Sequence, residues 1–353
     1  MPSGFRASRL PGASFSVKRS GPLALERGTV RALRPQDSRE GIERVERLRY
    51  VCIPGSPFTG STLLGTLLNE HPDCASIGAA VGLPRRPDLT TYLCSCGARF
   101  RECEFWRDIA ARTTSLGYPV NVFESGYWNT HLRLSRQPTL NALLARSLGS
   151  DRLNDARDAV VARWPGARAA ILGMGWSSWS LATAVLARTG KSVFIDTSRD
   201  HQRPKYLAMH PRLEVKVIHL FRDPRGNSAS IMKHTGADAA TAAKQWKHYN
   251  VEARRVRRYL PENAWLALRY EDLCADPHAV FDRISDFLGV PRAVIQIGAR
   301  TGKSHIIGNK MRLKAVSEIR EDRSWETRLD EGDLAVLADI AGATSREFGY
   351  DWP

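Results

Sequence analysis

Short apolar runs, each followed by a turn and a helical pattern, set the order of elements along this chain. The runs lie at residues 50–53, 192–196, 214–221 and 265–270. They are rich in aliphatic and aromatic residues, as expected of strands that are buried on both faces. Their alternation with helical segments predicts an α/β fold with a doubly wound, mostly parallel sheet.

Helical spacing of apolar residues marks the segments between and after these runs. Helices are predicted within residues 61–68, 177–189, 237–260, 279–288 and 333–348. Residues 84–165 lack strong strand signals, and we expect a helical insertion there that shapes a pocket.

The two ends of the chain differ in character. The first 25 residues contain four basic side chains and no acidic one, so residues 1–45 are predicted to be a disordered basic tail and lead-in. No internal repeat or flexible linker is visible in residues 46–353, which we expect to form a single α/β domain.

Charge and composition limit the partners. The formal net charge of the 353 residues is +15, which suits a polyanionic ligand. No basic stripe with interleaved aromatic residues indicates nucleic-acid binding. No secretory signal and no apolar run of membrane-spanning length is evident, so we expect a cytoplasmic protein with at most peripheral membrane contact. The oligomeric state stays open.

The loop from Gly55 to Thr62 is the strongest candidate for chemistry. It joins the first apolar run to a helix that begins at Ser61. A strand, a glycine loop and a helix start turn backbone N–H groups toward one point, where a phosphate fits. Gly55 and Gly60 match the spacing of a nucleotide-binding loop, but Ser61 stands where its lysine would be. The alternative is an ordinary tight turn.

A second candidate anion site follows the run at 214–221. Arg222 comes at the strand end, and Ser230 lies eight residues later on the predicted next helix. A planar guanidinium can grip a phosphate, and the hydroxyl adds a neutral donor. The alternative is an Arg-Asp-Pro turn with a solvated arginine.

These motifs together resemble the sulfotransferases that use 3′-phosphoadenosine-5′-phosphosulfate (PAPS), in particular their bacterial small-molecule branch. The 5′-phosphosulfate loop of that family resembles Pro57, Phe58, Thr59, Gly60, Ser61 and Thr62, and its 3′-phosphate site resembles Arg222 and Ser230. Residues 304–312 resemble its late nucleotide-contacting loop, which implies roles for Asn309 and Arg312. The resemblance implies a P-loop-like fold and transfer of a sulfuryl group from PAPS, as co-substrate, to a hydroxyl of a small molecule, sugar or lipid. It also implies that the insertion shapes the acceptor pocket, with Trp106, Tyr127, Trp128 and Trp164 as candidate lining residues or ordinary core aromatics.

The chain departs from the family pattern at the catalytic positions. Phe58 occupies the place of the usual lysine or arginine, and we expect Arg199 to supply the missing cation. Alanine stands at positions 79 and 80, where the family often has a glutamate. His201 is the preferred candidate for the base, with Asp196 and Asp200 as rivals.

Two other functions stay open at this point. A magnesium-dependent P-loop kinase for small molecules would use the glycine loop and Asp196, but must explain the missing lysine. A non-catalytic nucleotide-binding protein of sulfotransferase fold would account for Phe58 and Ala79 as lost chemistry.

Three of the six cysteines are clustered in sequence. Cys94, Cys96 and Cys103 follow the spacing C-x-C-x6-C. Reduced thiols in a tight structural loop are the preferred interpretation, and no catalytic metal is expected. A zinc site is the alternative, if a fourth ligand comes from elsewhere in the chain.

Overall fold

The fold is described from a computed structural model of the chain. It describes residues 47–352 except 136, 146, 298–303, 309 and 314–318. Within this range, residues 142, 310 and 311 are described by their backbone and not by their side chains. The chain divides into two units, Met1–Arg44 and Val45–Pro353, and all the described residues belong to the second. The predicted basic tail at residues 1–45 lies outside them.

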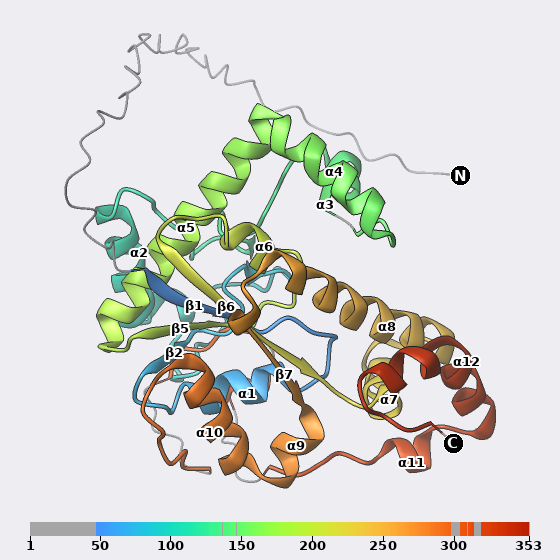
Figure 1. Cartoon of the computed structure of the whole chain (residues 1–353). Coiled ribbons are helices and arrows are strands. Elements are labelled where there is room, and N and C mark those ends of the chain that lie inside the picture. Colours follow the sequence, from blue (N-terminus) through green and yellow to red (C-terminus); the bar gives the residue numbers. More distant parts are fainter. Residues whose placement is uncertain are drawn as a thin grey trace, which may run out of the picture. The chain divides into compact units, whose positions relative to one another are not determined.

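A five-stranded parallel sheet lies at the centre of this unit (Figure 1). Its strands are β1 (Leu48–Cys52), β2 (Cys74–Ser76), β5 (Val193–Asp196), β6 (Leu213–Phe221) and β7 (Trp265–Arg269), in the order β2-β5-β1-β6-β7. Every neighbouring pair is parallel, which confirms the predicted doubly wound α/β architecture. Ligands of such sheets bind at the carboxyl ends of the strands, where the winding direction changes. Here that edge lies around β1, between β5 and β6.

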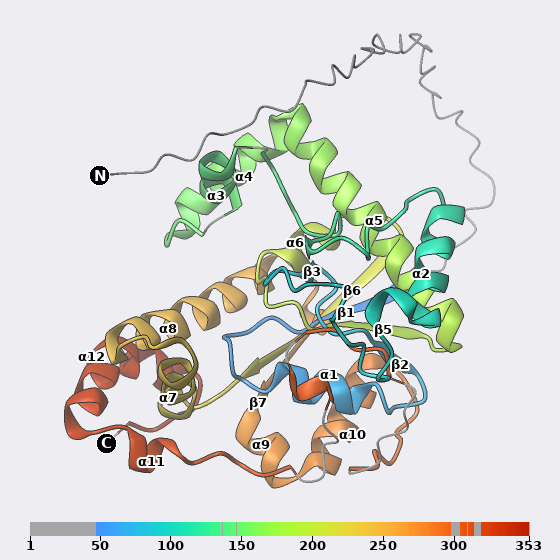
Figure 2. The same cartoon turned by 180° about the vertical axis from the view of Figure 1, so that it is seen from behind.

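Helices cover both faces of the sheet (Figures 1 and 2). They are α1 (Ser61–Leu68), α2 (Glu104–Ser115), α3 (Pro138–Ala145), α4 (Asp151–Arg163), α5 (Pro165–Thr189), α6 (Arg203–Leu207), α7 (Pro224–Thr235), α8 (Ala239–Val256), α9 (Tyr270–Ala275), α10 (Pro277–Leu288), α11 (Trp325–Arg328) and α12 (Glu331–Glu347). Short 3-10 turns lie at Phe100–Glu102, Arg257–Tyr259, Glu262–Ala264 and Lys310–Leu313.

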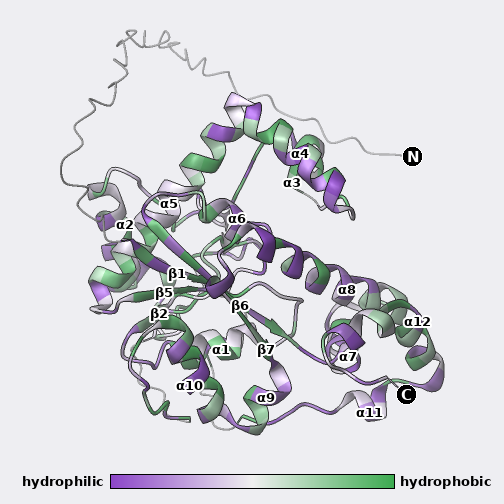
Figure 3. Ribbon diagram, in the orientation of Figure 1, coloured by the Kyte–Doolittle hydropathy of each residue, from purple (hydrophilic) through white to green (hydrophobic). Residues whose placement is uncertain are grey.

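Successive side chains along β1 contribute to two hydrophobic cores, one on each face of the sheet. Tyr50 and Cys52 pack in the cluster that includes buried residues of α2 and α5, whereas Val51 and Ile53 pack with α1 and α10 on the opposite face. Successive strand residues point to opposite faces, so one buried strand supplies both cores. Figure 3 shows this distribution: hydrophobic colour lies on the central strands, and hydrophilic colour runs along much of α8.

The predicted insertion contains α2, α3, α4 and β4 (Gly126–Tyr127), which pairs antiparallel with β3 (Gly82–Leu83) just before the insertion. Trp106 and Trp128 are fully buried core residues, so the ordinary-core alternative holds for both. Tyr127 is 48% exposed and stacks on His131 at 4.0 Å.

The long helix α5 corrects one expectation. Its 25 residues are by length and composition sufficient to cross a membrane, although no such run was expected. The apolar stretch is hard to recognise in the sequence, because glycine, serine and tryptophan are interspersed among its aliphatic residues. More than half of its apolar window is buried within the protein, as in a core helix, so the evidence for a span is weak.

Candidate active site

The loop between β1 and α1 has the geometry of an anion cradle. Gly60, the residue before α1, has φ 89°, a conformation that side chains rarely adopt. A Cβ at Gly60 would also come within 2.8 Å of the Tyr270 ring. The first turn of α1 has neither a side-chain cap nor an acidic residue, so nothing described there competes with an anion.

Asn227, on the first turn of α7, holds this loop in place. Its side-chain amide donates to the carbonyl of Pro57 at 2.7 Å and accepts from the Ser56 hydroxyl at 2.8 Å. Asn227 and Ser56 are fully buried, so these bonds lie away from water. The sequence analysis missed Asn227, whose only signal was its place five residues after Arg222.

Arg222 joins the two predicted anion sites. Its Nη1 donates to the carbonyl of Phe58 at 3.2 Å and to the Ser230 hydroxyl at 3.3 Å, and its Nη2 donates to the carbonyl of Asp322 at 2.7 Å. The guanidinium lies over the Tyr270 ring at 4.7 Å. Three of its five N–H donors therefore have protein acceptors among the described residues. The second Nη2–H faces the Asp322 carboxylate, 3.6 Å from Nη2, so the Nε–H is the donor left for a ligand in this part of the chain.

The turn that carries Arg222 is braced from behind. Glu271 accepts from the backbone N–H of Asp223 at 2.9 Å and from the hydroxyl of Tyr350 at 2.7 Å. The indole of Trp246 donates to the carbonyl of Arg222 at 2.8 Å. These contacts fix the backbone at the start of the turn.

Phe58 has a strained backbone at the position of the usual cation. Its φ is 64°, which is uncommon for a bulky residue. The ring stacks on that of His234, an exposed residue of α7, with centroids 4.9 Å apart. An aromatic contact thus replaces the charge expected from the family pattern.

Asp196 is fully buried at the end of β5 and is saturated by donors. Its carboxylate accepts from Arg203 Nε at 2.8 Å, from the Tyr50 hydroxyl at 2.8 Å, and from the backbone N–H groups of Ala80 and Ser198. Burial raises the pKa of Asp196, but the charge of the Arg203 guanidinium and the hydrogen bonds from Ser198 and Ala80 together hold this pKa below its ordinary value. The carboxylate is therefore a poor base and a poor magnesium ligand, which weakens the kinase alternative.

The predicted catalytic pair follows β5. Arg199 is exposed, and His201 is partly buried against His248 and Tyr249 of α8. Burial lowers the pKa of His201, so the ring is neutral at pH 7, and its Nδ1 has no hydrogen-bond partner among the described residues. Neither residue contacts the Pro57–Thr62 loop in the described part of the chain. Asp200 accepts from the backbone at the start of α6.

A further histidine, which the sequence analysis missed, lies at the same edge. His131 follows Thr130, whose hydroxyl donates to the carbonyl of Ala80 at 2.6 Å. Burial lowers the pKa of His131, while the charge of Asp200 raises it. Its Nδ1 is buried and has no partner among the described residues. His131 thus lies beside the position where the family pattern often has a glutamate.

The late loop is only partly described. Asn309 and Lys303 lie outside the described residues. Arg312 is buried and donates to the carbonyls of Gly308 at 2.8 Å and Leu93 at 2.7 Å. Its guanidinium also lies 4.2 Å over the Tyr92 ring, so the predicted ligand contact of Arg312 stays a prediction.

The three clustered cysteines converge on a fourth residue. Cys94, Cys96 and Cys103 meet His305, and the four candidate ligand atoms lie within 4.8 Å of one another. His305 lies in the segment that resembles the late nucleotide-contacting loop, but the sequence offered no reason to pair it with the cysteines.

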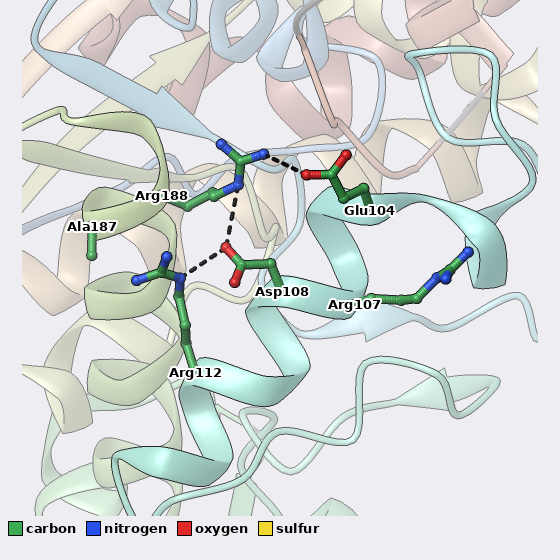
Figure 4. Close-up of a pocket in the computed structure, with 6 residues that line it drawn as sticks. All are labelled: Glu104, Arg107, Asp108, Arg112, Ala187 and Arg188. Atoms are coloured by element: carbon green, nitrogen blue, oxygen red, sulfur yellow. Dashed lines mark hydrogen bonds and ion pairs between the residues drawn. The ribbon is translucent and has the colours of Figure 1, made fainter.

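A charged hollow of 650 Å³ lies away from these residues, between α2 and α5 (Figure 4). Both of its acidic residues are already paired, because Arg188 contacts Glu104 at 3.3 Å and Asp108 at 3.2 Å, and Arg112 contacts Asp108 at 2.8 Å. None of the predicted site residues lines it, so we assign it no part in the chemistry.

Comparisons with known proteins place this geometry in a family. A family model described as the sulfotransferase family matches residues 135–293. This segment, which contains Arg222 and Ser230, is similar to sulfotransferases, and the resemblance predicted from the motifs is confirmed.

Two curated relatives agree with this match. Carbohydrate sulfotransferase 1 of Mus musculus is 27% identical over 168 residues, which cover 41% of this chain and 41% of that protein. Carbohydrate sulfotransferase 1 of Rattus norvegicus is 34% identical over 106 residues, which cover 24% of this chain and 26% of that protein. The chain thus spans less than half the length of these relatives.

Among solved structures, the sulfotransferase domain of the Synechococcus PCC 7002 olefin synthase is similar, with 22% identity and a TM-score of 0.44 over 87% of this chain and 97% of that one. The sulfotransferase STF9 of Mycobacterium avium has 14% identity and a TM-score of 0.42 over 87% and 78%. Scores this low do not define a common fold, so the fold assignment rests on the parallel strand order.

Proposed function

We propose that this protein is a PAPS-dependent sulfotransferase that transfers a sulfuryl group to a hydroxyl of a small molecule, sugar or lipid. The observation that carries the proposal is the position of Arg222, which contacts both the glycine loop and Ser230. One guanidinium thus links a cradle for the 5′-phosphosulfate to a site for the 3′-phosphate. A nucleotide with phosphates at both ends fits this arrangement better than ATP does.

The described residues fit such a ligand. The Nε–H of Arg222 and the Nη2–H that faces Asp322 form the side of the guanidinium fork that would hold two phosphate oxygens. The carboxylate of Asp322 lies 3.6 Å from Nη2 and would compete with the phosphate there. It is half exposed, so it can turn toward water. At the other end, the N–H groups at the start of α1 and the Thr62 hydroxyl would hold the phosphosulfate.

Sulfuryl transfer makes two demands on the protein. The S–O bond to the leaving phosphate breaks as the acceptor oxygen bonds to sulfur, so negative charge builds on that phosphate. With Phe58 at the usual cation position, the exposed guanidinium of Arg199 is our candidate to stabilise this charge. Its exposure to solvent supports this role.

The second demand is a base for the acceptor hydroxyl proton. We favour His201, because it is neutral at pH 7 and its Nδ1 has no described partner. His131 is the rival that the structure adds, with the same two properties and a position beside Ala80. The saturated carboxylate of Asp196 is not a candidate.

We further propose that residues 84–165 shape the acceptor pocket. Tyr127 is the predicted lining residue that best supports this, since it is half exposed and stacks on His131 near the strand ends. The basic side chains of α8 contribute less charge than its composition suggests, because Arg255 pairs with Asp151 of α4 at 3.1 Å. We keep the expectation of a cytoplasmic protein, since α5 is largely a core helix.

The test compares ligands without magnesium. We expect 3′,5′-ADP to raise the melting temperature, and ATP at the same concentration to have little effect. Labelled PAPS with a panel of hydroxyl acceptors then tests turnover. If ATP with magnesium raises the melting temperature and 3′,5′-ADP does not, the proposal is overturned in favour of a kinase. Binding of 3′,5′-ADP without transfer to any acceptor would favour the non-catalytic protein.

A further inference from the structure

We propose that Cys94, Cys96, Cys103 and His305 bind one structural zinc ion. The three cysteines lie within ten residues of one another, whereas His305 comes 202 residues after Cys103. The fold therefore supplies the fourth ligand that the sequence could not identify.

The distances between the ligand atoms match a tetrahedral shell. The Sγ atoms of Cys96 and Cys103 are 3.7 Å apart, and Nδ1 of His305 lies 3.6 Å from Cys94 Sγ and 3.4 Å from Cys103 Sγ. With Zn–S near about 2.3 Å and Zn–N near about 2.0 Å, a tetrahedron has edges of about 3.8 Å between sulfurs and about 3.5 Å between sulfur and nitrogen. All three observed separations lie close to these edges.

Hydrogen bonding alone explains the cluster less well. The single lone pair on Nδ1 of His305 can accept from one thiol, yet two sulfurs lie at similar distances from it. All six cysteines are unpaired, so no disulfide accounts for the convergence. A metal ion at the centre uses the lone pair and all three sulfurs together.

The surroundings hold the ligands in the binding arrangement. Backbone N–H groups of Cys96 and Trp106 donate to the sulfurs of Cys94 and Cys103. Such donors stabilise metal-bound thiolates. The His305 ring stacks on Phe105 with centroids 4.2 Å apart and parallel planes, which fixes its orientation.

The segment that carries His305 is fixed on both sides of it. The buried hydroxyl of Ser95 donates to the carbonyl of Ser304 at 2.7 Å and accepts from the N–H of Ile306 at 2.8 Å. The ligand-bearing loops therefore stay in register without the ion.

Ligand type and number identify the metal and its role. Three thiolates and one imidazole in a tetrahedron suit zinc. Four protein ligands leave no position for water or substrate, so the site is structural. A neighbouring hollow of 570 Å³, lined in part by Phe105 and His305, gives the ion a route of entry. The zinc would tie the cysteine loop before α2 to the segment leading to the late loop.

The first experiment measures metal in the full chain, purified after growth with added zinc. We expect about one zinc per chain, at least a tenfold lower content in Cys96→Ser and His305→Asn, and no change in the controls Cys274→Ser and His278→Asn. Both control residues lie outside the cluster, and His278 is exposed. Wild-type protein without zinc, or full zinc in the two ligand variants, would overturn the proposal.

A second measurement uses wild-type protein, so it does not depend on folding of the variants. Cobalt added after chelation should give the visible absorption of a tetrahedral thiolate complex, saturating at about one equivalent. Alkylation of the partly exposed Cys96, followed by mass spectrometry, should be slow with zinc and faster after chelation. Octahedral cobalt spectra together with an unchanged alkylation rate would contradict the site. Neither measurement involves PAPS, so the zinc site can fail without affecting the proposed function.

Discussion

Replacement of Arg222 by alanine tests the link between the two anion sites. The variant loses the Nε–H, and the Nη2–H now facing Asp322, that we assign to the 3′-phosphate, and the side chain that carries them is 7% exposed. Removing one partner of a largely desolvated charge pair costs about 2–4 kcal/mol. We therefore expect the Kd for 3′,5′-ADP to rise by about 30- to 700-fold.

Calorimetry with two nucleotides can isolate this contact. Wild-type protein should bind 3′,5′-ADP more tightly than 5′-AMP, because 5′-AMP lacks the 3′-phosphate. Arg222→Ala should bind both nucleotides with similar affinity, since the partner of that phosphate is gone. Arg222→Lys should fall between, because it keeps the charge and loses the planar fork.

The matched control is Arg257→Ala, which removes an exposed arginine side chain of the described part of the chain. Its affinity should stay within about twofold of wild type. Circular dichroism and the melting temperature show whether each variant is folded. A folded Arg222→Ala protein that still prefers 3′,5′-ADP over 5′-AMP by the wild-type ratio would refute the assignment of the 3′-phosphate site.

Three other outcomes are expected. Arg199→Ala should lower kcat by on the order of 10²–10³ while Kd for 3′,5′-ADP changes little, and near-normal turnover would show that another cation serves. His201→Gln and His131→Gln identify the base. The variant that removes the true base should lose activity and the fall of kcat/KM at acidic pH, whereas the other variant should keep that fall. Burial lowers the pKa of His219 to about 4 in the folded chain. In the unfolded chain this histidine takes up a proton at about pH 6.5, whereas in the folded chain it stays neutral until about pH 4. Unfolding free energy should therefore fall by up to about 3 kcal/mol between pH 6.5 and 4; His219→Gln should flatten this loss, and an unchanged slope would show that other groups cause it.

The sequence predicted the units of the fold well where the signal was local. The observed strands β1, β5, β6 and β7 begin and end within about two residues of the predicted runs, because apolar periodicity and turn residues act over a few positions. The three-residue strand β2 escaped prediction, since so short a segment carries no period. Helix α5 begins twelve residues before the predicted start, because its glycine and alanine content obscures the pattern.

The candidate site divides in the same way. The glycine loop and the Arg222–Ser230 pair were predicted because each lies within one strand–turn–helix unit, where spacing determines geometry. Asp196 could be placed at a strand end from sequence. Its ion pair with Arg203 and its bond to Tyr50, 146 residues away, could not.

The sequence by itself therefore determined the order of strands, turns and helices, the parallel sheet and the two anion-binding turns, because the geometry of these features depends on neighbouring residues. Packing of distant segments decided which side chains meet. It placed His305 beside the three cysteines and His131 beside Ala80. It also bound the carboxylate of Asp196 to the hydroxyl of Tyr50 in the core. No spacing encodes such contacts, because residues far apart in sequence become neighbours only when the sheet and its helices bury their apolar faces against one another.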